Sequence, residues 1–286
     1  VADGEESFRD DEIAVLEVFD GSPAEEAGLL VGDVIVAVDD WDAAGATVDD
    51  VSSRVRGEVG TTVLIKLRDP EGHVRTVEVR RDRVDLRPRT EFRSLGNGVA
   101  YLRLDTLLAR QVAQAKESLA ANADATHLIL DLRGVATGDP LSMSEAAGWF
   151  LGHVELGAFE SRYDRFALQT PDKPALYKNE LTVLMNGSTS GLGEILALAL
   201  AEHKRATLIG TPSAGGFSLT RLVHLPSGWG LSLSVARYHS PRGHGLHAEG
   251  LTPDIIFDDL TLADYREHKD PVLQRTIEWV GIPSGE

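Results

Sequence analysis

The hydrophobic positions along the chain fall into two regions with different spacing. Up to about residue 86, apolar residues form short β-prone runs that are separated by turn signals such as Asp20-Gly21 and Gly32-Asp33. Strands are predicted at 13–19, 34–38, 63–67 and 74–79. Helices are predicted at 22–28, which opens with a capping Ser and a Pro and ends at a Gly, and at 49–56. The first region is therefore predicted to be a compact, β-rich module.

The second region follows a polar segment, residues 87–94, which is predicted to be a linker. Apolar runs without alternation at 128–132 and 181–185 indicate buried parallel strands, and 107–121 has the apolar face of a helix. The other predicted elements are strands at 99–104 and 206–209, helices at 143–151 and 191–203, and a hairpin of 223–225 with 231–238. This order predicts an α/β domain with helices on a largely parallel sheet, so that the whole chain is α+β.

Composition and charge narrow the classes of function. The chain has 286 residues, of which 28 are Lys or Arg and 45 are Asp or Glu, and its formal net charge is −17. Such a charge argues against nucleic acid and against an anionic membrane as the main partner. The absence of cysteine excludes disulfides, thiolate metal sites and a cysteine nucleophile. No apolar run reaches the ~18 residues that span a bilayer, so no membrane insertion is expected within this chain.

Five sequence blocks carry a resemblance to known families. Gly21-Ser22-Pro23-Ala24-x-x-Ala27-Gly28-Leu29-x-x-Gly32-Asp33 resembles the core of a bacterial PDZ domain. Four later blocks resemble, in family order, the C-terminal processing peptidases of the S41 serine peptidase family, at 128–134, 183–195, 210–215 and 236–255. The resemblance implies a PDZ-like domain over 1–86 and a crotonase/ClpP-like α/β peptidase domain over 87–286. In the family, such proteins cleave polypeptides near their C-termini.

The family's catalytic positions hold residues that cannot perform its chemistry. The family places a nucleophilic Ser three residues before the Glu-Ile of a helix, a Lys base in a later Gly-Lys-Gly turn, and a supporting Gln four residues after it. This chain has Gly191, Gly216 and Thr220 there. A hydroxyl becomes nucleophilic only when a neighbouring base takes its proton, so Ser and Lys work as a unit. The resemblance therefore implies a peptidase fold without its dyad.

Part of the family's oxyanion-binding geometry is expected to remain. Where the family continues Asn-Pro-Gly-Gly, this chain reads Val-Ala-Thr-Gly, so that Gly138 keeps one backbone donor and the amide of Leu192 is the second. A donor accelerates the reaction only when there is a tetrahedral intermediate to stabilise. Without a nucleophile, these amides are expected to bind a carbonyl or a carboxylate at most.

Two neighbouring hydroxyls keep an active enzyme open as an alternative. Ser190 and Ser188 lie beside position 191 and are fallback nucleophiles for an S41-type serine endopeptidase. A shift of one residue at a helix N-terminus turns a side chain by about 100°, and hydroxyls at this place more commonly cap the helix. The candidate bases Lys204 and His224 fall at the far end of the helix and on a predicted strand.

The PDZ-like region offers a candidate peptide-binding groove. PDZ domains accept a peptide C-terminus as an added strand between a sheet edge and a helix. The helix at 49–56 makes Val51, Ser52 and Val55 candidate groove residues, and packing of the two valines in the core is an equal alternative. The family's carboxylate-binding loop is not recognisable before Ile13. Because the chain does not start with Met, we expect it to begin inside a longer protein.

Neither a metal nor a cofactor is expected. His244, His247 and Glu249 are metal-ligand residue types, but their spacing fits no strong zinc signature, and a solvated loop is favoured. Arg133 follows Asp131 at the end of a buried strand, where an ion pair or loop anchor is predicted.

The leading hypothesis is a pseudopeptidase, a catalytically inactive S41 relative that binds polypeptides, a protein C-terminus or a partner protein. The competing hypothesis is an active serine endopeptidase that uses Ser190 or Ser188. A third is a structural subunit that assembles with itself or with an active paralogue. Analogy with the family favours the cell envelope, periplasmic or extracellular, although the chain carries no signal of its own.

Overall fold

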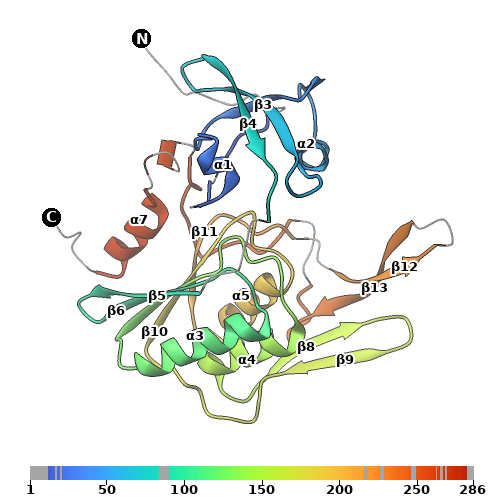
Figure 1. Cartoon of the computed structure of the whole chain (residues 1–286). Helices are drawn as coiled ribbons and strands as arrows, with labels where there is room; N and C mark the ends of the chain where they lie inside the picture. The colour runs from blue at the N-terminus through green and yellow to red at the C-terminus, as the bar shows by residue number, and fades with distance from the viewer. Residues whose placement is uncertain are drawn as a thin grey trace. The chain divides into compact units, whose positions relative to one another are not determined.

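The chain forms two compact units in a computed structural model (Figure 1). The first comprises Val1–Arg87 with Leu260–Pro271, and the second comprises Pro88–Asp259 with Val272–Glu286. The domain bounds predicted from the sequence, 1–86 and 87–286, stay a prediction. No helix in the described part of the chain is long and apolar enough to cross a membrane. The described residues are 12–16, 18–19, 21–83, 90–215, 218–225, 229–245, 249–261, 263–264, 267 and 269–281.

The first unit contains a four-stranded antiparallel sheet in the order β2-β1-β3-β4. Its strands are β1 (Val34–Val38), β2 (Trp41–Asp42), β3 (Thr62–Arg68) and β4 (Val74–Arg80). Buried and exposed residues alternate along β3, because one face of the strand covers the core. The inward residues Val63, Ile65 and Leu67 pack with Val38 in this core.

Two capped helices complete the first unit. In α1 (Pro23–Glu26), the hydroxyl of the N-cap Ser22 accepts a hydrogen bond from Glu25 N at 3.2 Å. In α2 (Val48–Val55), Thr47 and Asp50 form a capping box in which each side chain accepts from the other's backbone N–H. The predicted helices are therefore confirmed to within one or two residues.

The second unit is built on a six-stranded sheet in the order β14-β11-β10-β7-β6-β5. All neighbouring strands run parallel except β5, which pairs antiparallel with β6. Its strands are β5 (Thr90–Gly96), β6 (Val99–Leu104), β7 (His127–Asp131), β10 (Glu180–Met185), β11 (Thr207–Gly210) and β14 (Ile255–Ile256). β7 and β10 are buried along most of their length, which explains their apolar runs without alternation. The predicted α/β class is confirmed.

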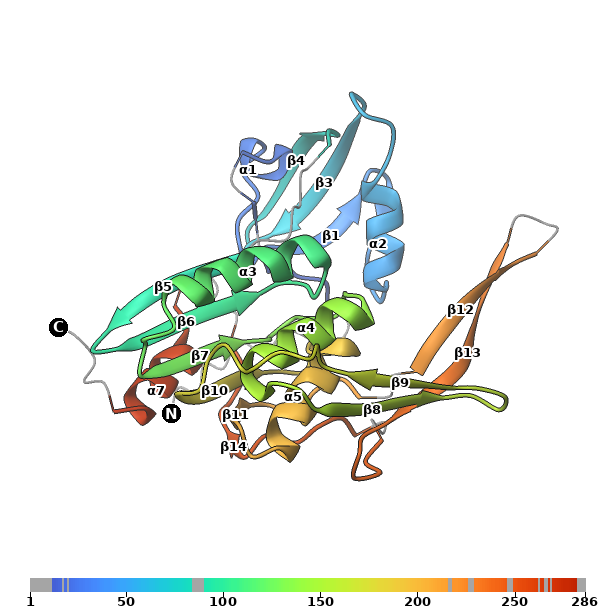
Figure 2. The same cartoon turned by 90° about the horizontal axis from the view of Figure 1, so that it is seen from below.

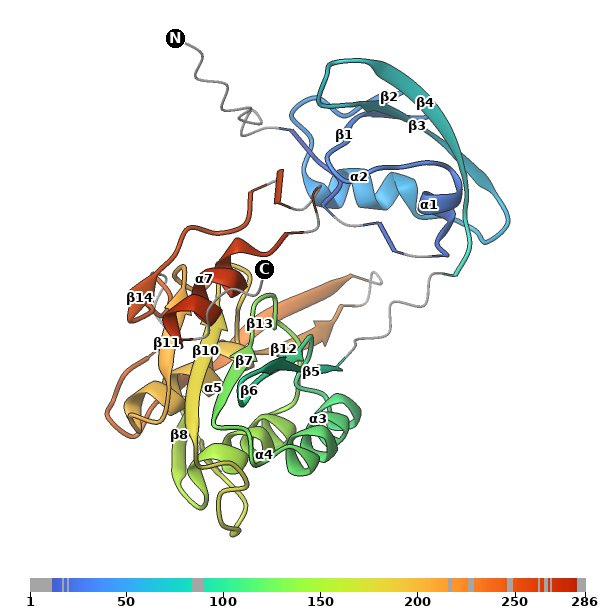
Figure 3. The same cartoon turned by 90° about the vertical axis from the view of Figure 1, so that its left-hand side faces the viewer.

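Helices lie on both sides of this sheet. α3 (Ala109–Ala121), α4 (Pro140–Leu151) and α5 (Leu192–Glu202) lie together on one side, and α7 (Pro271–Trp279) lies on the other (Figures 1 and 3). Almost every residue of α5 is buried, so this helix is central to the core. Because β7 and β10 are parallel neighbours, the loops that follow them leave from the same edge of the sheet, where α5 begins.

A second antiparallel sheet, in the order β12-β13-β8-β9, extends from this unit (Figure 2). Its strands are β8 (Glu155–Glu160), β9 (Arg165–Gln169), β12 (Ser218–His224) and β13 (Gly230–His239). β12 is an edge strand, so the backbone groups on one side of it have no partner strand in the described sheet. It begins shortly after the loop that carries the family's lysine position.

Two predicted segments differ from the structure. The linker predicted at 87–94 is wrong from residue 90 onward, because Thr90–Gly96 forms β5. Asn97 and Gly98, with φ of 49° and 80°, form the tight turn between β5 and β6. The hairpin was not predicted from the sequence, because β5 is polar in composition. Among the described residues of 13–19, the predicted strand forms only an isolated bridge, between Ala14 and Val34.

Candidate functional site

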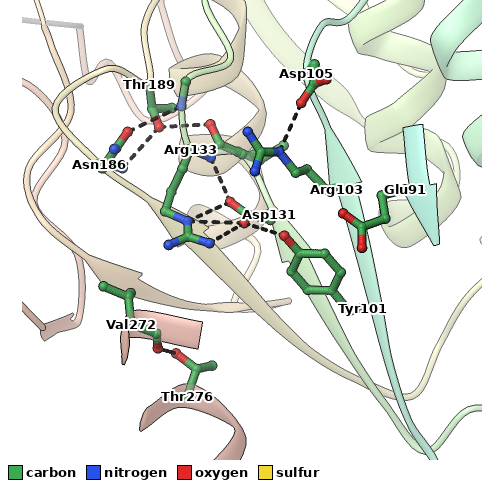
Figure 4. Close-up of polar contacts among 12 residues, drawn as sticks. Glu91, Tyr101, Arg103, Asp105, Asp131, Arg133, Asn186, Thr189, Val272 and Thr276 are labelled. Carbon is green, nitrogen blue, oxygen red and sulfur yellow. Dashed lines mark hydrogen bonds and ion pairs between the residues drawn. The ribbon is translucent and has the colours of Figure 1, made fainter. Parts of the chain in front are cut away.

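Side chains of the loop between β10 and α5 fix it to the loop after β7 (Figure 4). Asn186 Oδ1 accepts hydrogen bonds from Ser188 N (3.1 Å) and from Gly134 N (3.3 Å). Thr189 is fully buried. Its hydroxyl accepts from Asn186 N (3.1 Å) and donates to Leu132 O (2.9 Å). Thr189 is therefore the hydroxyl residue that anchors this loop.

Gly191 forms the turn that leads from this loop into α5. It is the buried N-cap residue of the helix, with φ 59° and ψ −116°. These angles belong to the first central residue of a type II′ turn, where glycine dominates because a Cβ is strained. A sharp strand-to-helix turn of this kind presents the nucleophile in hydrolases that have a nucleophile elbow. The structure therefore keeps the elbow backbone at a residue without a side chain.

The carboxylate of Glu194 connects this elbow to a second loop. Glu194 is fully buried in the first turn of α5, where the helix N-terminus stabilises its negative charge. Oε2 accepts from Gly191 N (2.8 Å), and Oε1 accepts from Ser213 Oγ (2.5 Å) and from Gly215 N (2.7 Å). Sequence spacing marked Glu194 only as a landmark of the helix. Glu194 connects the two loops through its contact with Gly215, which is 21 residues away in the sequence, and no local sequence pattern predicts such a contact.

The second loop, 211–215, is also held from its other side. Ser213 Oγ accepts from Leu251 N (2.7 Å), and Ser213 N donates to Leu251 O (3.1 Å). Gly250 has φ 69°, and a Cβ at this position would lie 2.1 Å from Ser213 O. The close approach therefore requires a glycine, which accounts for one of the glycines in the matching sequence block.

The loop clamp brings together the two regions in which the sequence predicts the family's Ser and Lys positions. Gly215, which immediately precedes the lysine position, donates to the same carboxylate that accepts from Gly191 N. Gly216 itself lies outside the described residues. Thr220, which the resemblance places where the family has its supporting Gln, is an exposed residue of β12.

The fallback nucleophiles flank the buried Thr189. Ser188 is exposed and Ser190 is half-buried. The backbone of Ser190 is fixed, because its N–H donates to Val135 O (2.9 Å) and its carbonyl accepts from Gly193 N (3.1 Å). Neither hydroxyl is hydrogen-bonded to any residue in the described part of the chain, so no described base contacts them.

Two backbone amides are predicted by the sequence to be donors to an oxygen of a ligand. Leu107 pairs with the backbone on either side of Gly138, because Leu107 N donates to Thr137 O (2.8 Å) and Leu107 O accepts from Asp139 N (3.0 Å). The N–H of Gly138 takes no part in this pairing. Leu192 N is the first N–H of α5, and the first four N–H groups of a helix have no partner within it. The amides of Gly138 and Leu192 are therefore candidate donors to a carbonyl or carboxylate oxygen.

A buried charged cluster lies at the carboxyl ends of β6 and β7 (Figure 4). Asp131, which is fully buried, accepts from Arg133 Nη2 (2.6 Å) and from Tyr101 Oη (2.7 Å). The predicted ion pair of Arg133 is therefore confirmed. Burial, and then the Asp131 charge, raises the pKa of the Tyr101 phenol, which keeps it a donor. Burial by itself lowers the pKa of Arg103, but the charges of Asp131 and Asp105 outweigh it and raise that pKa.

The candidate groove residues of the PDZ-like unit lie in different surroundings. Val51 is 4% exposed and belongs to the core of the unit, and Val55 is partly buried against the same core. These positions favour the core interpretation for both valines. Ser52 is half-buried on the same helix, and its place in a groove stays a prediction.

The suggested metal-ligand residues are not gathered into a cluster in the described part of the chain. His244 Nδ1 contacts Glu202 Oε1 (2.5 Å), Glu249 is exposed, and His247 lies outside the described residues. Three described residues of other elements, Asp69, Glu71 and His73, have ligand atoms close together in the turn between β3 and β4. Glu71 and His73 are exposed, and Asp69 already pairs with His73.

A small β-rich unit and an α/β unit with a sharp turn at the N-terminus of its central helix agree with the PDZ and peptidase domains that the sequence predicts. The family model of peptidase family S41 matches residues 98–257, and that of the PDZ domain matches residues 15–69. The chain belongs to peptidase family S41 and carries a PDZ domain.

Similar proteins are C-terminal processing proteases. The chain is 34% identical to the carboxyl-terminal-processing protease of Picosynechococcus sp., covering 86% of this chain and 61% of that protein. It is 32% identical to the chloroplastic carboxyl-terminal-processing peptidase 2 of Arabidopsis thaliana, covering 85% and 49%. The solved photosystem II D1 C-terminal processing protease is 28% identical, with a TM-score of 0.64 over 87% of this chain and 69% of that one. The chain thus spans about half to three-fifths of the length of these curated relatives.

Proposed function

We propose that this chain is a catalytically silent member of family S41 that binds polypeptides without cleaving them. The observation that carries the proposal is the elbow, where the turn and its Glu194 clamp are in place but Gly191 offers no hydroxyl. Without a nucleophile, the acyl-enzyme that precedes hydrolysis cannot form. Glycine also avoids the strain, on the order of 1–3 kcal/mol, that a side chain would introduce at these angles.

Binding of an extended polypeptide is supported by groups that surround the elbow. The edge strand β12 leads away from loop 211–215, and an edge strand can add an extended peptide through backbone hydrogen bonds. The amides of Gly138 and Leu192 suit a carbonyl or a C-terminal carboxylate, and the helix N-terminus favours the negative charge of a carboxylate. The proposed ligand is therefore a polypeptide segment with a free C-terminus.

Labelling with a fluorophosphonate probe tests catalytic silence. We expect no labelling of the wild type and weak labelling of the double variant Gly191→Ser with Gly216→Lys, which restores a hydroxyl and an amine. The matched variant Gly191→Ala with Gly216→Lys has the same strain and amine but no hydroxyl, so it should stay unlabelled. The proposal fails if the wild type cleaves an unfolded substrate and Ser190→Ala or Ser188→Ala abolishes the cleavage.

A separate measurement tests polypeptide binding. A fluorescent unstructured peptide with a free C-terminus should bind, and the same peptide with an amidated C-terminus should bind several-fold more weakly, because it lacks the carboxylate. Equal binding of the two peptides would remove the role of Gly138 and Leu192. If neither peptide binds, polypeptide binding is wrong even if the chain is silent as a peptidase.

Assembly is a second proposed mode of action. Leu231, Leu233 and Val235 of β13 are 45%, 44% and 41% exposed, and neighbouring exposed apolar residues often mark contacts between proteins. The partner would be another copy of this chain or an active S41 paralogue. Light scattering that shows only monomers, with no paralogue recovered by pull-down, would exclude this mode. The family analogy favours action in the cell envelope, which fractionation of the source cells would check.

A further inference from the structure

A pocket of about 450 Å³ lies at the C-terminal end of α5. The helix has 11 residues, so this end lies about 16 Å from the elbow. Leu198, Ala201 and Leu251 form apolar walls, and Glu202 contributes a carboxylate. Glu202 lies eight residues along α5 from Glu194, while Gly250 and Leu251 of the lining also lie against Ser213 of loop 211–215.

The carboxylate of Glu202 is not fully compensated by its neighbours. The residue is 8% exposed. Oε1 accepts from Ser240 Oγ (2.7 Å) and contacts His244 Nδ1 (2.5 Å). Within the described part of the chain, Oε2 accepts no hydrogen bond, and no Lys or Arg forms an ion pair with this carboxylate. A largely buried carboxylate without a full counter-charge costs free energy, so the pocket attracts a cation.

The end of the helix adds to this negative potential. Glu202 is the last residue of α5, and the C-terminus of a helix carries a partial negative charge from its free carbonyl groups. Burial, and then the Glu202 charge, raises the pKa of the neighbouring Tyr238 phenol. The carboxylate and the helix terminus therefore both favour a positive group.

The shape of the pocket selects among cations. A divalent metal ion needs several oxygen ligands, and the described lining supplies one carboxylate. Gly243 and Gly250, with φ of 82° and 69°, line the pocket without side chains, so a chain-like group can enter. An arginine side chain has an apolar stem for the apolar walls and a planar guanidinium that can donate to Oε2 and to carbonyl oxygens together.

We infer that this pocket binds the arginine side chain of a partner polypeptide, with the guanidinium paired to Glu202 and the stem against Leu198, Ala201 and Leu251. The inference does not rest on the proposed function, because it depends on the carboxylate of Glu202 and not on the elbow at Gly191. The chain's own net charge of −17 is in keeping with a basic partner segment.

A titration followed by NMR tests the inference on the full chain. N-acetyl-arginine methylamide should shift the amide signals of Gly243, Gly245 and Leu251 in a saturable way. The citrulline compound, which has nearly the same shape without the charge, should bind at least tenfold more weakly. Equal binding of the two compounds, no saturable shift at these amides, or tighter binding of the lysine compound would overturn the assignment.

Two variants localise the binding. Glu202→Gln removes the charge and should reduce affinity for the arginine compound at least tenfold. His244→Arg should have the same effect in a folded protein, because His244 is 64% exposed at the side chain and an arginine there can pair with Glu202 itself. His203→Arg adds the same charge at an adjacent exposed position and should bind as the wild type does. Unchanged binding by a folded His244→Arg protein would place the arginine compound elsewhere.

Discussion

At the residue scale, two residues at the start of α5, Gly191 and Glu194, determine what the site can do. Glu194 joins the elbow to loop 211–215 with three hydrogen bonds. Gly191, which we propose occupies the family's nucleophile position, has no side chain that could react. Gly191 was recognisable from the spacing to Glu194 along the chain. The bonds of Glu194 to Ser213 and Gly215 were not, because they join distant segments.

The first prediction concerns the Glu194 clamp. In Glu194→Gln, an NH₂ group replaces one of the two carboxylate oxygens that accept from Gly191 N, Ser213 Oγ and Gly215 N. At least one of these buried donors then loses its acceptor. We expect the free energy of unfolding to fall by about 1–3 kcal/mol. Urea denaturation measures it, with Glu117→Gln on the exposed face of α3 as the control, for which a change within about 0.5 kcal/mol is expected. Equal effects of the two substitutions would show that the clamp contributes nothing to stability.

The second prediction concerns His127, which contacts Thr182 Oγ1 through Nε2 (2.8 Å). Burial lowers the pKa of His127 below its ordinary value of 6.5, although the Glu180 charge acts in the opposite direction. The unfolded chain therefore binds a proton at a higher pH than the folded one, and stability falls as the pH drops below about 6.5. In His127→Gln, the loss of urea stability between about pH 7.5 and pH 5.5 should be smaller than in the wild type. The exposed His203→Gln should retain the wild-type pH dependence, and an unchanged slope in both variants would contradict the prediction.

At the scale of elements, the sequence predicted most of the helices and strands whose own residues carry a cap or an apolar pattern. The caps at Ser22 and Thr47 and the apolar runs of β7 and β10 could be read directly from the chain. β8, β9, β14 and α7 were not predicted. β14 is only two residues long and pairs with β11, and the exposed β9 has a single buried residue, so their stability comes from tertiary partners.

The third prediction concerns the N-cap of α2. Thr47→Ala removes the oxygen that accepts from Asp50 N, and the helix should lose about 1 kcal/mol. Amide hydrogen exchange within α2 measures this loss. Ser52→Ala removes a hydroxyl from the middle of the same helix, where alanine is favourable, and should not accelerate exchange. If both variants exchange at the wild-type rate, the capping box has no role in stability.

At the scale of the whole molecule, the described residues form two hydrophobic cores with no residue in common. The core of the PDZ-like unit contains Val51, and the core of the peptidase-like unit contains Leu196. A cavity in one core removes contacts only among the residues of that core, because packing interactions act at short range. Each core is therefore expected to govern the stability of its own unit.

The fourth prediction follows from these separate cores. Val51→Ala should weaken protection from hydrogen exchange in β1 and β3, by about 1–3 kcal/mol for a small buried truncation. Leu196→Ala should weaken protection in β7 and β10 by about 2–5 kcal/mol. Each variant serves as the control for the other. Equal loss of protection in both units from either variant would show that they unfold together.

By itself, the sequence determined the α/β class and the two kinds of domain, because these follow from residue spacing and matching motifs, and it led to the proposal that Gly191 occupies the nucleophile position. Tertiary structure alone decided that Glu194 joins the elbow to loop 211–215 and that Glu202 lines a pocket with Leu198 and Leu251. It also placed Val51 in a core. The physical reason is that periodicity specifies which face of an element is apolar, whereas the partner of a buried carboxylate depends on how distant segments pack.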